Sequence, residues 1–263
     1  MTLPLNSLFD THIHLDLLPP GFDDQEEMKL AEHIGVGRFV VPGVEPSGWE
    51  RLLAVASSIR GGLAAPGIHP LAARQWEKSK PELRRLLTEK RVAAVGEIGL
   101  DGALESPAQI QEQAFRGQLR LARDFGLPVL LHCRKATGKL LEILKQEGAD
   151  EMGGIWHNFS GSPETARAAI SLNFALAFGG IVTWPEARRA PETLKEIPAE
   201  WIVLESDAPD MTPHPHRGEP NRPLYLGLVA EKVAALRGWS LEETAAITTA
   251  NACRVLRLES LKS

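Results

Sequence analysis

The sequence predicts a (β/α)8 barrel, in which strand and helix alternate eight times, and three observations support this fold class. The chain has 263 residues, and one such barrel takes roughly 250. Short apolar runs alternate with amphipathic stretches along the whole chain, as in α/β proteins. Several runs are rich in Val and Ile without polar alternation, which is typical of parallel strands buried on both faces. We therefore expect one domain over residues 1–263.

The elements follow in order along the chain. The predicted strands are the apolar runs at 8–12, 37–44, 62–68, 92–98, 128–131, 154–156, 174–178 and 201–204. Between them, Ser79 and Ser106 each open a capping-box pattern, and Ser162 precedes a helix-starting proline. Gly126 and Gly148 are placed to end helices. An open doubly wound sheet is the alternative, but no glycine-rich phosphate loop follows the first run.

Composition narrows the class of protein. The chain is 43% hydrophobic and 24% charged, as ordinary globular proteins are. A net charge of −5 argues against gripping duplex nucleic acid mainly through counterion release. Two cysteines exclude a disulfide framework and favour a reducing cytoplasm. No signal-peptide pattern opens the sequence and no apolar run reaches the ~18 residues of a membrane span, so we expect no membrane partner.

The barrel prediction places an active site at the carboxyl ends of the strands. Five of the eight histidines follow predicted strands. The residues of chemical interest at these ends are His12, His14, His69, Glu97, Asp101, His132, Arg134, His157, Ser160 and Asp207. Because parallel strands of a barrel end on the same face, these side chains are expected to share one rim.

The pair His12 and His14 is the first candidate. Residues two apart on an extended segment point to the same side, so both imidazoles can bind one ion at ~2.0–2.1 Å. Alone, the pair is equally compatible with two polar residues that bind nothing. Its shared rim with Glu97, His132 and Asp207 favours a metal site.

Glu97 ends an apolar run, where an unpaired buried carboxylate would be costly. Bridging two cations would remove that cost, and simple exposure is the alternative. His132 and His157 each end a run. One such histidine alone suggests a buried imidazole bonded to backbone, whereas two at equivalent ends favour metal ligands. Asp207 ends the last run and can bind a metal and accept a proton, with a helix N-cap as the rival role.

Substrate contacts are predicted at four further residues. Arg134 follows His132 by two and would bind a phosphate, with a surface salt bridge as the alternative. His69 would bind phosphate or stabilise the turn before Pro70. Ser160 would donate to a phosphate or cap the following turn. Arg222 would contact substrate or anchor its loop. Cys133, by contrast, is expected to face away from the site.

Six motifs in order resemble those of the TatD-type metal-dependent deoxyribonucleases of the amidohydrolase superfamily. They are Asp10–His14, Gly67–Pro70, Gly96–Asp101, Leu131–Arg134, His157–Gly161 and Glu205–Pro209. The stretch Asp207–Met211 with Gly218–Pro223 is most similar to the YjjV-type subgroup. The chain departs from the family pattern at Gly102, where an aromatic residue is frequent, and at Lys135, where many members have Asp.

The resemblance implies a two-metal centre holding Zn, Mg or Mn. His12, His14, Glu97 and Asp207 would bind one ion, and Glu97, His132 and His157 the second. It implies a deoxyribonuclease or phosphodiesterase in which two metals activate a water and Asp207 is the general base, with Glu97 as the other catalytic residue. The expected substrate is single-stranded DNA, a 3′ end or a small phosphodiester, and the expected state is a cytoplasmic monomer.

Two other functions remain open from the residues alone. Related barrels use similar ligand sets on carbonyl substrates, so hydrolysis of a small-molecule ester or amide is the first. A noncatalytic module that binds metal or nucleic acid is the second. The presence of Asp207 argues against it, since a degenerate relative is expected to lose its base first.

Overall fold

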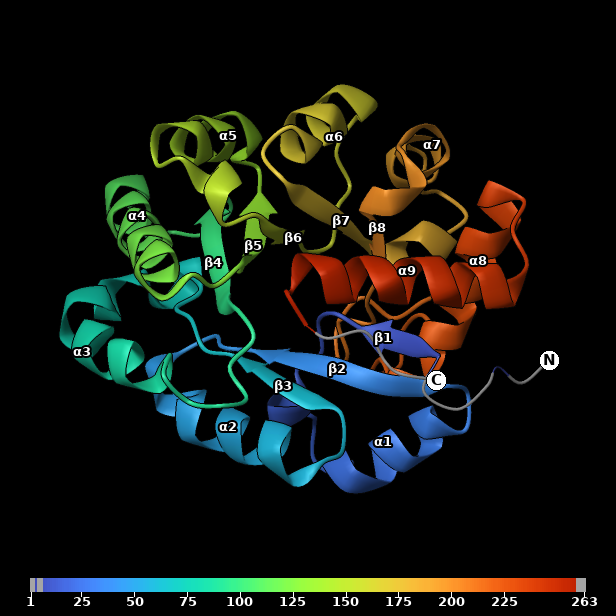
Figure 1. Cartoon of the computed structure of the whole chain (residues 1–263). Coiled ribbons are helices and arrows are strands. Elements are labelled where there is room, and N and C mark those ends of the chain that lie inside the picture. Colours follow the sequence, from blue (N-terminus) through green and yellow to red (C-terminus); the bar gives the residue numbers. More distant parts are fainter. Residues whose placement is uncertain (1–2, 4–6, 259–263) are drawn as a thin grey trace.

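The computed structural model describes residue 3 and residues 7–258 of the chain. Eight parallel strands lie at the centre and helices surround them (Figure 1). The strands are β1 (Leu8–Asp10), β2 (Val36–Pro42), β3 (Gly62–Ala65), β4 (Val95–Asp101), β5 (Val129–Arg134), β6 (Gly154–Trp156), β7 (Phe174–Phe178) and β8 (Ile202–Leu204). The helices are α1 (Asp24–Glu32), α2 (Trp49–Ser58), α3 (Trp76–Leu86), α4 (Ala108–Phe125), α5 (Thr137–Gln146), α6 (Pro163–Ile170), α7 (Arg189–Glu196), α8 (Leu226–Arg237) and α9 (Leu241–Val255).

The strands form a ring with two weaker seams. Continuous ladders join β1 to β3 and β4 to β8. At one seam, Gly43 N–H donates to the Gly96 carbonyl at 2.8 Å and Glu97 N–H donates to the Gly43 carbonyl at 2.9 Å. At the other, Asp207 N–H donates to the His12 carbonyl at 2.9 Å. The predicted (β/α)8 barrel is confirmed, and both seams pass through residues of the predicted metal site.

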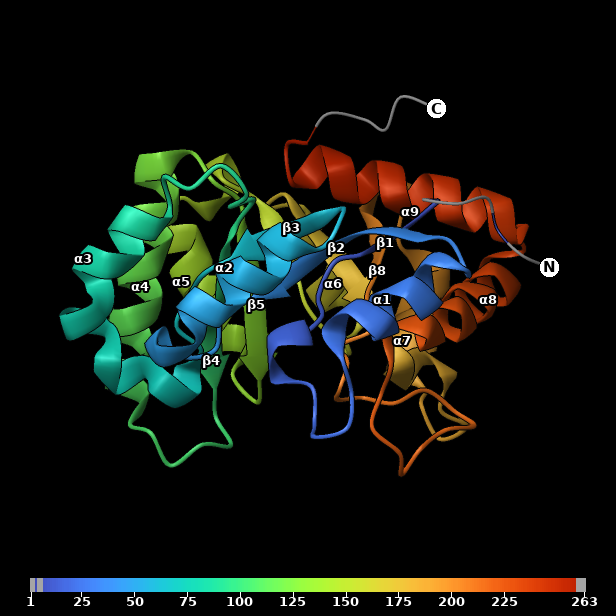
Figure 2. The same ribbon diagram turned by 90° about the horizontal axis from the view of Figure 1, so that it is seen from below.

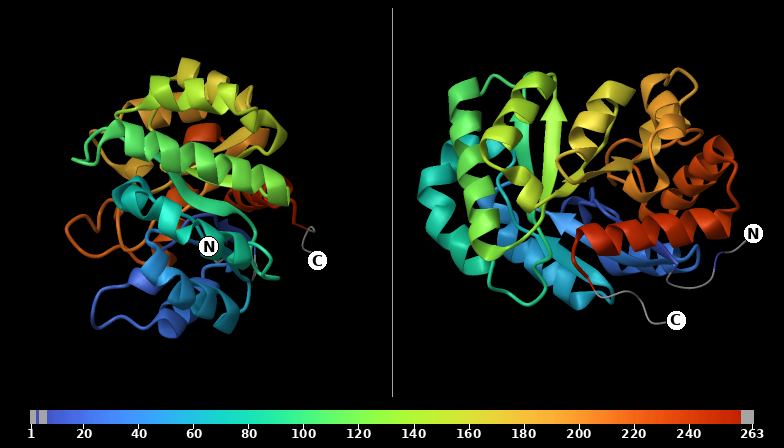
Figure 3. Two further views of the ribbon diagram at one scale, coloured as in Figure 1. Left: turned by 90° about the vertical axis from the view of Figure 1, so that its left-hand side faces the viewer. Right: turned by 45° about the horizontal axis from the view of Figure 1, so that its top comes forward.

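The inside of the barrel is a packed apolar core. Each strand, or the segment leading into it, contributes at least one apolar side chain: Phe9, Val40, Ala65, Ala94, Leu130, Ile155, Ala175, Ala177 and Val203. Residues of α9 complete this cluster, because that helix lies across one end of the barrel (Figure 3). The long loops after β1, β4 and β8 emerge at the opposite end (Figure 2), which leaves that end open for a site.

The helix signals were only partly correct. Ser162 caps α6 by accepting the Thr165 N–H, and Gly126 and Gly148 adopt the left-handed conformation after α4 and α5. Ser79, however, lies inside α3, which begins three residues earlier at the buried Trp76. Packing of that tryptophan in the core sets this start. Ser106 makes no cap, since α4 begins at Ala108 with Pro107 before it.

The strand boundaries shifted where the chain bends toward the site. β3 ends at Ala65 instead of residue 68, and β4 runs on to Asp101. Within residues 7–258, no helix combines the length and the apolar character that crossing a membrane requires.

Candidate metal centre

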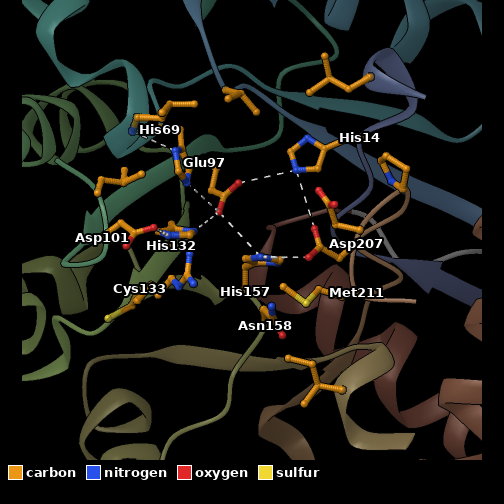
Figure 4. A pocket seen from close by; sticks show the side chains of 18 of the residues that line it. His14, His69, Glu97, Asp101, His132, Cys133, His157, Asn158, Asp207 and Met211 are labelled. Carbon is orange, nitrogen blue, oxygen red and sulfur yellow. Dashed lines mark hydrogen bonds and ion pairs between the residues drawn. The ribbon is translucent and has the colours of Figure 1, made fainter. Parts of the chain in front are cut away.

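The predicted ligands converge at the open end of the barrel. His12 and His14 follow β1, Glu97 lies in β4, and Asp207 follows β8. His132 lies in β5, and His157 follows β6. Figure 4 shows the side chains of His14, Glu97, His132, His157 and Asp207 pointing toward one another. All of them except the partly exposed His132 are buried.

Four of these residues bring their donor atoms close to one another. The Nε2 atoms of His12 and His14 lie 3.3 Å apart, and Glu97 Oε2 lies 3.4 Å and 3.8 Å from them. Asp207 Oδ1 lies 3.8 Å and 3.9 Å from the same two nitrogens. Ligands of a tetrahedral ion with bonds of ~2.1 Å lie about 3.4 Å apart. The two nitrogens and Glu97 Oε2 therefore form a compact group that fits one divalent cation, and Asp207 Oδ1 lies beside its two nitrogens.

The other oxygen of Glu97 faces a second group of nitrogens. Glu97 Oε1 lies 2.7 Å from His132 Nδ1, 3.8 Å from His157 Nε2 and 4.0 Å from His69 Nε2. His69, Glu97 and His132 also form a compact group with the spacing of a metal site. One carboxylate thus lies between two clusters of imidazoles, which is the position of a bridging ligand.

Two further carboxylates orient the imidazoles of the second group. Asp101 Oδ2 lies 3.2 Å from His132 Nε2, and Glu205 Oε2 lies 3.1 Å from His157 Nδ1. A carboxylate that accepts the N–H of one ring nitrogen leaves the other nitrogen free to bind a metal. In this arrangement His132 would bind through Nδ1 and His157 through Nε2.

The imidazoles and carboxylates of the site shift one another's pKa values. Burial on its own raises the pKa of Glu97, but the imidazoles of His12 and His157 outweigh it and hold this pKa well below its usual range. Burial lowers the pKa of His157, yet Glu205 and Asp207 outweigh it and raise the pKa to about 10. Burial also lowers the pKa of His12 and of His14.

Asp207 is the least compensated carboxylate of the site. Its burial raises its pKa well above the usual range, against the charge of His157, and the nearby Glu205 and Glu97 raise it further. Several buried carboxylates this close together need positive charge beside them in order to stay ionised. The donor set of imidazoles and carboxylates therefore fits divalent metal ions, which would supply the missing positive charge.

Comparison with known proteins supports the same conclusion. A family model described as "TatD related DNase" matches residues 9–257. The chain belongs to the TatD family. YabD of Bacillus subtilis strain 168, named an uncharacterized metal-dependent hydrolase, is 41% identical over 253 residues, which are 95% of this chain and 99% of that protein. YjjV of Escherichia coli K12, named likewise, is 34% identical over 90% of this chain and 92% of its own.

Solved structures agree with this assignment. The crystal structure of YjjV, a TatD homologue from E. coli K12, superposes with a TM-score of 0.90 at 33% identity and covers 97% of this chain and 99% of that chain. A TatD family hydrolase from Entamoeba histolytica shares the fold, with a TM-score of 0.80 at 17% identity, and covers 97% of this chain and 99% of its own. The resemblance predicted from the motifs is confirmed, and this chain is a metal-dependent hydrolase of the TatD family.

Three of the four predicted substrate residues of this TatD-family chain line the cavity above the ligands. The cavity has a volume of about 670 Å³, and His69, Arg134 and Ser160 are among its lining residues. Arg134 and Ser160 are exposed at its mouth. His69 combines both roles considered from the sequence, because its Nδ1 accepts the Leu71 N–H at 3.1 Å while its Nε2 faces Glu97.

Arg222 is not among the residues that line this cavity, so its predicted contact with substrate stays a prediction. Its guanidinium donates two hydrogen bonds to Glu27 of α1, at 2.8 Å and 2.9 Å. Glu27 is buried, so this paired contact satisfies a carboxylate that would otherwise lack a partner. The arginine therefore anchors the loop after β8 to α1. Loop anchoring is the alternative role predicted for Arg222 from the sequence.

Sequence reasoning missed three residues of the site. Glu205 and Asp101 both lie within the quoted motifs, but no role as orienting carboxylates was assigned to either. Cys133 was expected to face away, yet it lines the cavity at the end of β5. The signal for Glu205 was its position directly after β8, at the end of the barrel where site residues gather.

A glycine of the β4 motif allows these partners to approach. Gly99 has φ of +152°, and a Cβ there would lie 1.9 Å from the His132 carbonyl oxygen. Gly99 is also paired with His132 in the β4–β5 ladder. Only glycine allows β4 and β5 to pack at this distance, which sets the spacing between Glu97 and His132.

Proposed function

We propose that this chain hydrolyses phosphodiester bonds with two divalent metal ions, and that its expected substrate is single-stranded DNA or a 3′ end, or else a small phosphodiester. The observation that carries the proposal is the position of Glu97, whose Oε2 faces His12 and His14 and whose Oε1 faces His132 and His157. Two cations at such spacing suit an anionic ester attacked by a weak nucleophile. The family's description as DNase-related supports this choice of reaction.

The metal ions would neutralise the phosphoryl oxygens and lower the pKa of water toward neutrality. His12, His14, Glu97 and Asp207 would hold one ion, and Glu97, His132 and His157 the other. Asp207 has one oxygen toward His12 and His14 and the other 3.7 Å from His157 Nε2. Its carboxylate therefore reaches both groups and can orient the attacking water and accept its proton.

Three side chains of the cavity would bind the substrate. Arg134 offers a planar cation at the mouth, and Ser160 offers a hydroxyl, both suited to a phosphate oxygen. His69 faces the second group of imidazoles and would contact the phosphate from that side. A cytoplasmic location and a monomeric state remain predictions of the sequence.

The test is a hydrolysis assay with Mg²⁺, Mn²⁺ or Zn²⁺ on single-stranded DNA and on simple phosphodiesters. We expect metal-dependent turnover that Asp207→Asn abolishes. Asp150→Asn, at an exposed position near the start of β6, is the matched control and should retain full activity. Equal activity in Asp207→Asn would refute the assignment of the base. Absence of turnover on every phosphodiester, with hydrolysis of carboxylic esters instead, would refute the reaction class.

A further inference from the structure

The mouth of the cavity carries an unusual set of exposed apolar side chains. Among the described residues, four large hydrophobic side chains are substantially exposed: Leu17, Leu30, Leu71 and Met211. Three of them line the cavity above the metal centre, with exposed fractions of 50% for Leu17, 55% for Leu71 and 38% for Met211. We call these three residues the apolar rim. Scattered exposed leucines need no explanation, but a cluster around a site does.

The apolar rim is attached directly to the ligand-bearing segments. Leu17 follows His14 by three residues in a short helical turn, and Leu71 donates its N–H to His69 Nδ1 at 3.1 Å. Met211 follows Asp207 by four residues. Its carbonyl packs so closely on Gly180 that a Cβ there would lie 1.8 Å away. Figure 4 shows Met211 beside His157 and Asn158 at the edge of the cluster.

A second hollow continues the cavity outward. It has a volume of about 470 Å³ and shares Leu71 and Leu104 with the cavity above the metal centre. The remaining lining comes from Arg74, Glu105 and Ser106. Leu71 and Leu104 therefore continue the apolar lining from the cavity into the second hollow, which leaves space for a substituent beside a phosphoryl group.

The lining of the larger cavity has few of the cations and aromatic side chains that bind a nucleic-acid strand. Arg134 is the one lysine or arginine among the described residues that line the larger cavity, whereas Asp210 adds an exposed carboxylate at its mouth. Phe, Trp and Tyr are absent from that lining. Grooves for single strands combine several cations with aromatic platforms. Arg134 in the cavity and Arg74 in the outer hollow are too few cations for a strand, and beside the apolar rim they match one phosphate that carries an uncharged apolar group.

We propose that Leu17, Leu71 and Met211 form a subsite for the apolar ester group of a small phosphodiester whose phosphoryl group lies at the metal centre. This proposal rests on the proposed phosphodiesterase function. In the reaction, the oxygen of water bonds to phosphorus and one ester P–O bond breaks. The released oxygen takes up a proton and leaves as the alcohol, and a phosphate monoester remains.

The test uses two dianions that share one head group, phenylphosphonate and methylphosphonate, with the metal-loaded protein. We expect phenylphosphonate to bind about 10-fold more tightly, because its ring is removed from water at the apolar rim. Leu17→Ser/Leu71→Ser should reduce this ratio to about 2. Leu30→Ser is the matched control, since Leu30 is 45% exposed on α1 and lies outside both hollows.

Hydrolysis gives the second readout. Phenyl 4-nitrophenyl phosphate and methyl 4-nitrophenyl phosphate share a leaving group, and the double variant should raise the KM of the phenyl ester several-fold with little change in kcat. A phosphonate ratio near 1 in the unaltered protein, or one that the double variant leaves unchanged, would overturn the subsite. A rise in KM confined to single-stranded oligonucleotides would overturn it as well. Tight phenylphosphonate binding without turnover of any phosphodiester would support the subsite and refute the proposed function.

Discussion

Glu205 and His157 form a buried pair in which the carboxylate orients one imidazole of the second group. Glu205 Oε2 lies 3.1 Å from His157 Nδ1, while its Oε1 accepts the Asn158 backbone N–H at 2.6 Å. Glu205 itself is fully buried. With both oxygens engaged, the carboxylate fixes the ring so that Nε2 faces Glu97 and Asp207. The geometry of a proposed metal ligand is thus set by a residue that does not face the cavity.

Replacing this carboxylate should weaken the site without unfolding the barrel. Glu205→Gln retains the shape but removes the charge that holds the His157 N–H. We expect kcat/KM on a phosphodiester to fall about 10- to 100-fold, the usual effect of losing such a partner, together with weaker metal binding by titration. Glu200→Gln, at an exposed position before β8, should change neither quantity. Unchanged metal affinity in Glu205→Gln would contradict the orienting role.

Glu97 is expected to decide how many ions the protein holds. In Glu97→Gln, a neutral amide replaces the carboxylate that faces both groups of imidazoles, so bridging is lost. Elemental analysis after dialysis should find fewer than two ions per chain. Activity should fall by more than ~100-fold, which exceeds the loss expected when only a residue that orients a ligand is replaced. Glu231→Gln on the exposed side of α8 serves as the comparison. Full occupancy by two ions in Glu97→Gln would argue against a bridging carboxylate.

Gly99→Ala should separate β4 from β5. The added Cβ would meet the His132 carbonyl at 1.9 Å, and φ of +152° is unfavourable for alanine. A loss of stability of about 3 kcal/mol or more is expected in denaturant unfolding, with reduced metal content. Gly138→Ala is the control, because a Cβ added at Gly138 in α5 would enter open space, with nothing within 4 Å beyond its own helix backbone and chain neighbours. Alanine there should stabilise the helix slightly.

Glu147 provides a pH-dependent contribution to stability away from the site. Hydrogen bonds from Arg120 and Arg116 hold its pKa below the usual range, against the opposing effect of burial. A carboxyl with a lowered folded pKa stabilises the protein above its unfolded pKa, and this effect is lost as the pH falls through the folded value. Glu147→Gln should cost about 1 kcal/mol at pH 7.

The difference between Glu147→Gln and the unaltered protein should disappear in acid, below the lowered pKa. Urea unfolding over a pH series measures it, with Glu192→Gln on the exposed side of α7 as the control. Turnover at neutral pH should be unaffected, because Glu147 lies outside the cavity of the metal centre. A constant difference across the whole pH range would show that shape, and not charge, causes the effect.

The apolar runs predicted the strands well because burial on both faces leaves a sequence signal that does not depend on neighbours. Each of the eight runs overlaps an observed strand. Helix starts were less predictable. The pattern at Ser79 is local, whereas the start of α3 follows from the packing of Trp76 in the core. Arg222 illustrates the same limit, since its partner Glu27 lies 195 residues away in sequence.

The sequence by itself determined the barrel and the residues at its rim, because hydrophobic periodicity and the position after a strand are local properties. Only the tertiary structure decided which atoms meet. It turned one oxygen of Glu97 toward His12 and the other toward His132, and it brought Glu205 to His157. It also gathered Leu17, Leu71 and Met211 at one mouth. Those relationships depend on the closure of the ring, which joins segments that are distant in the chain.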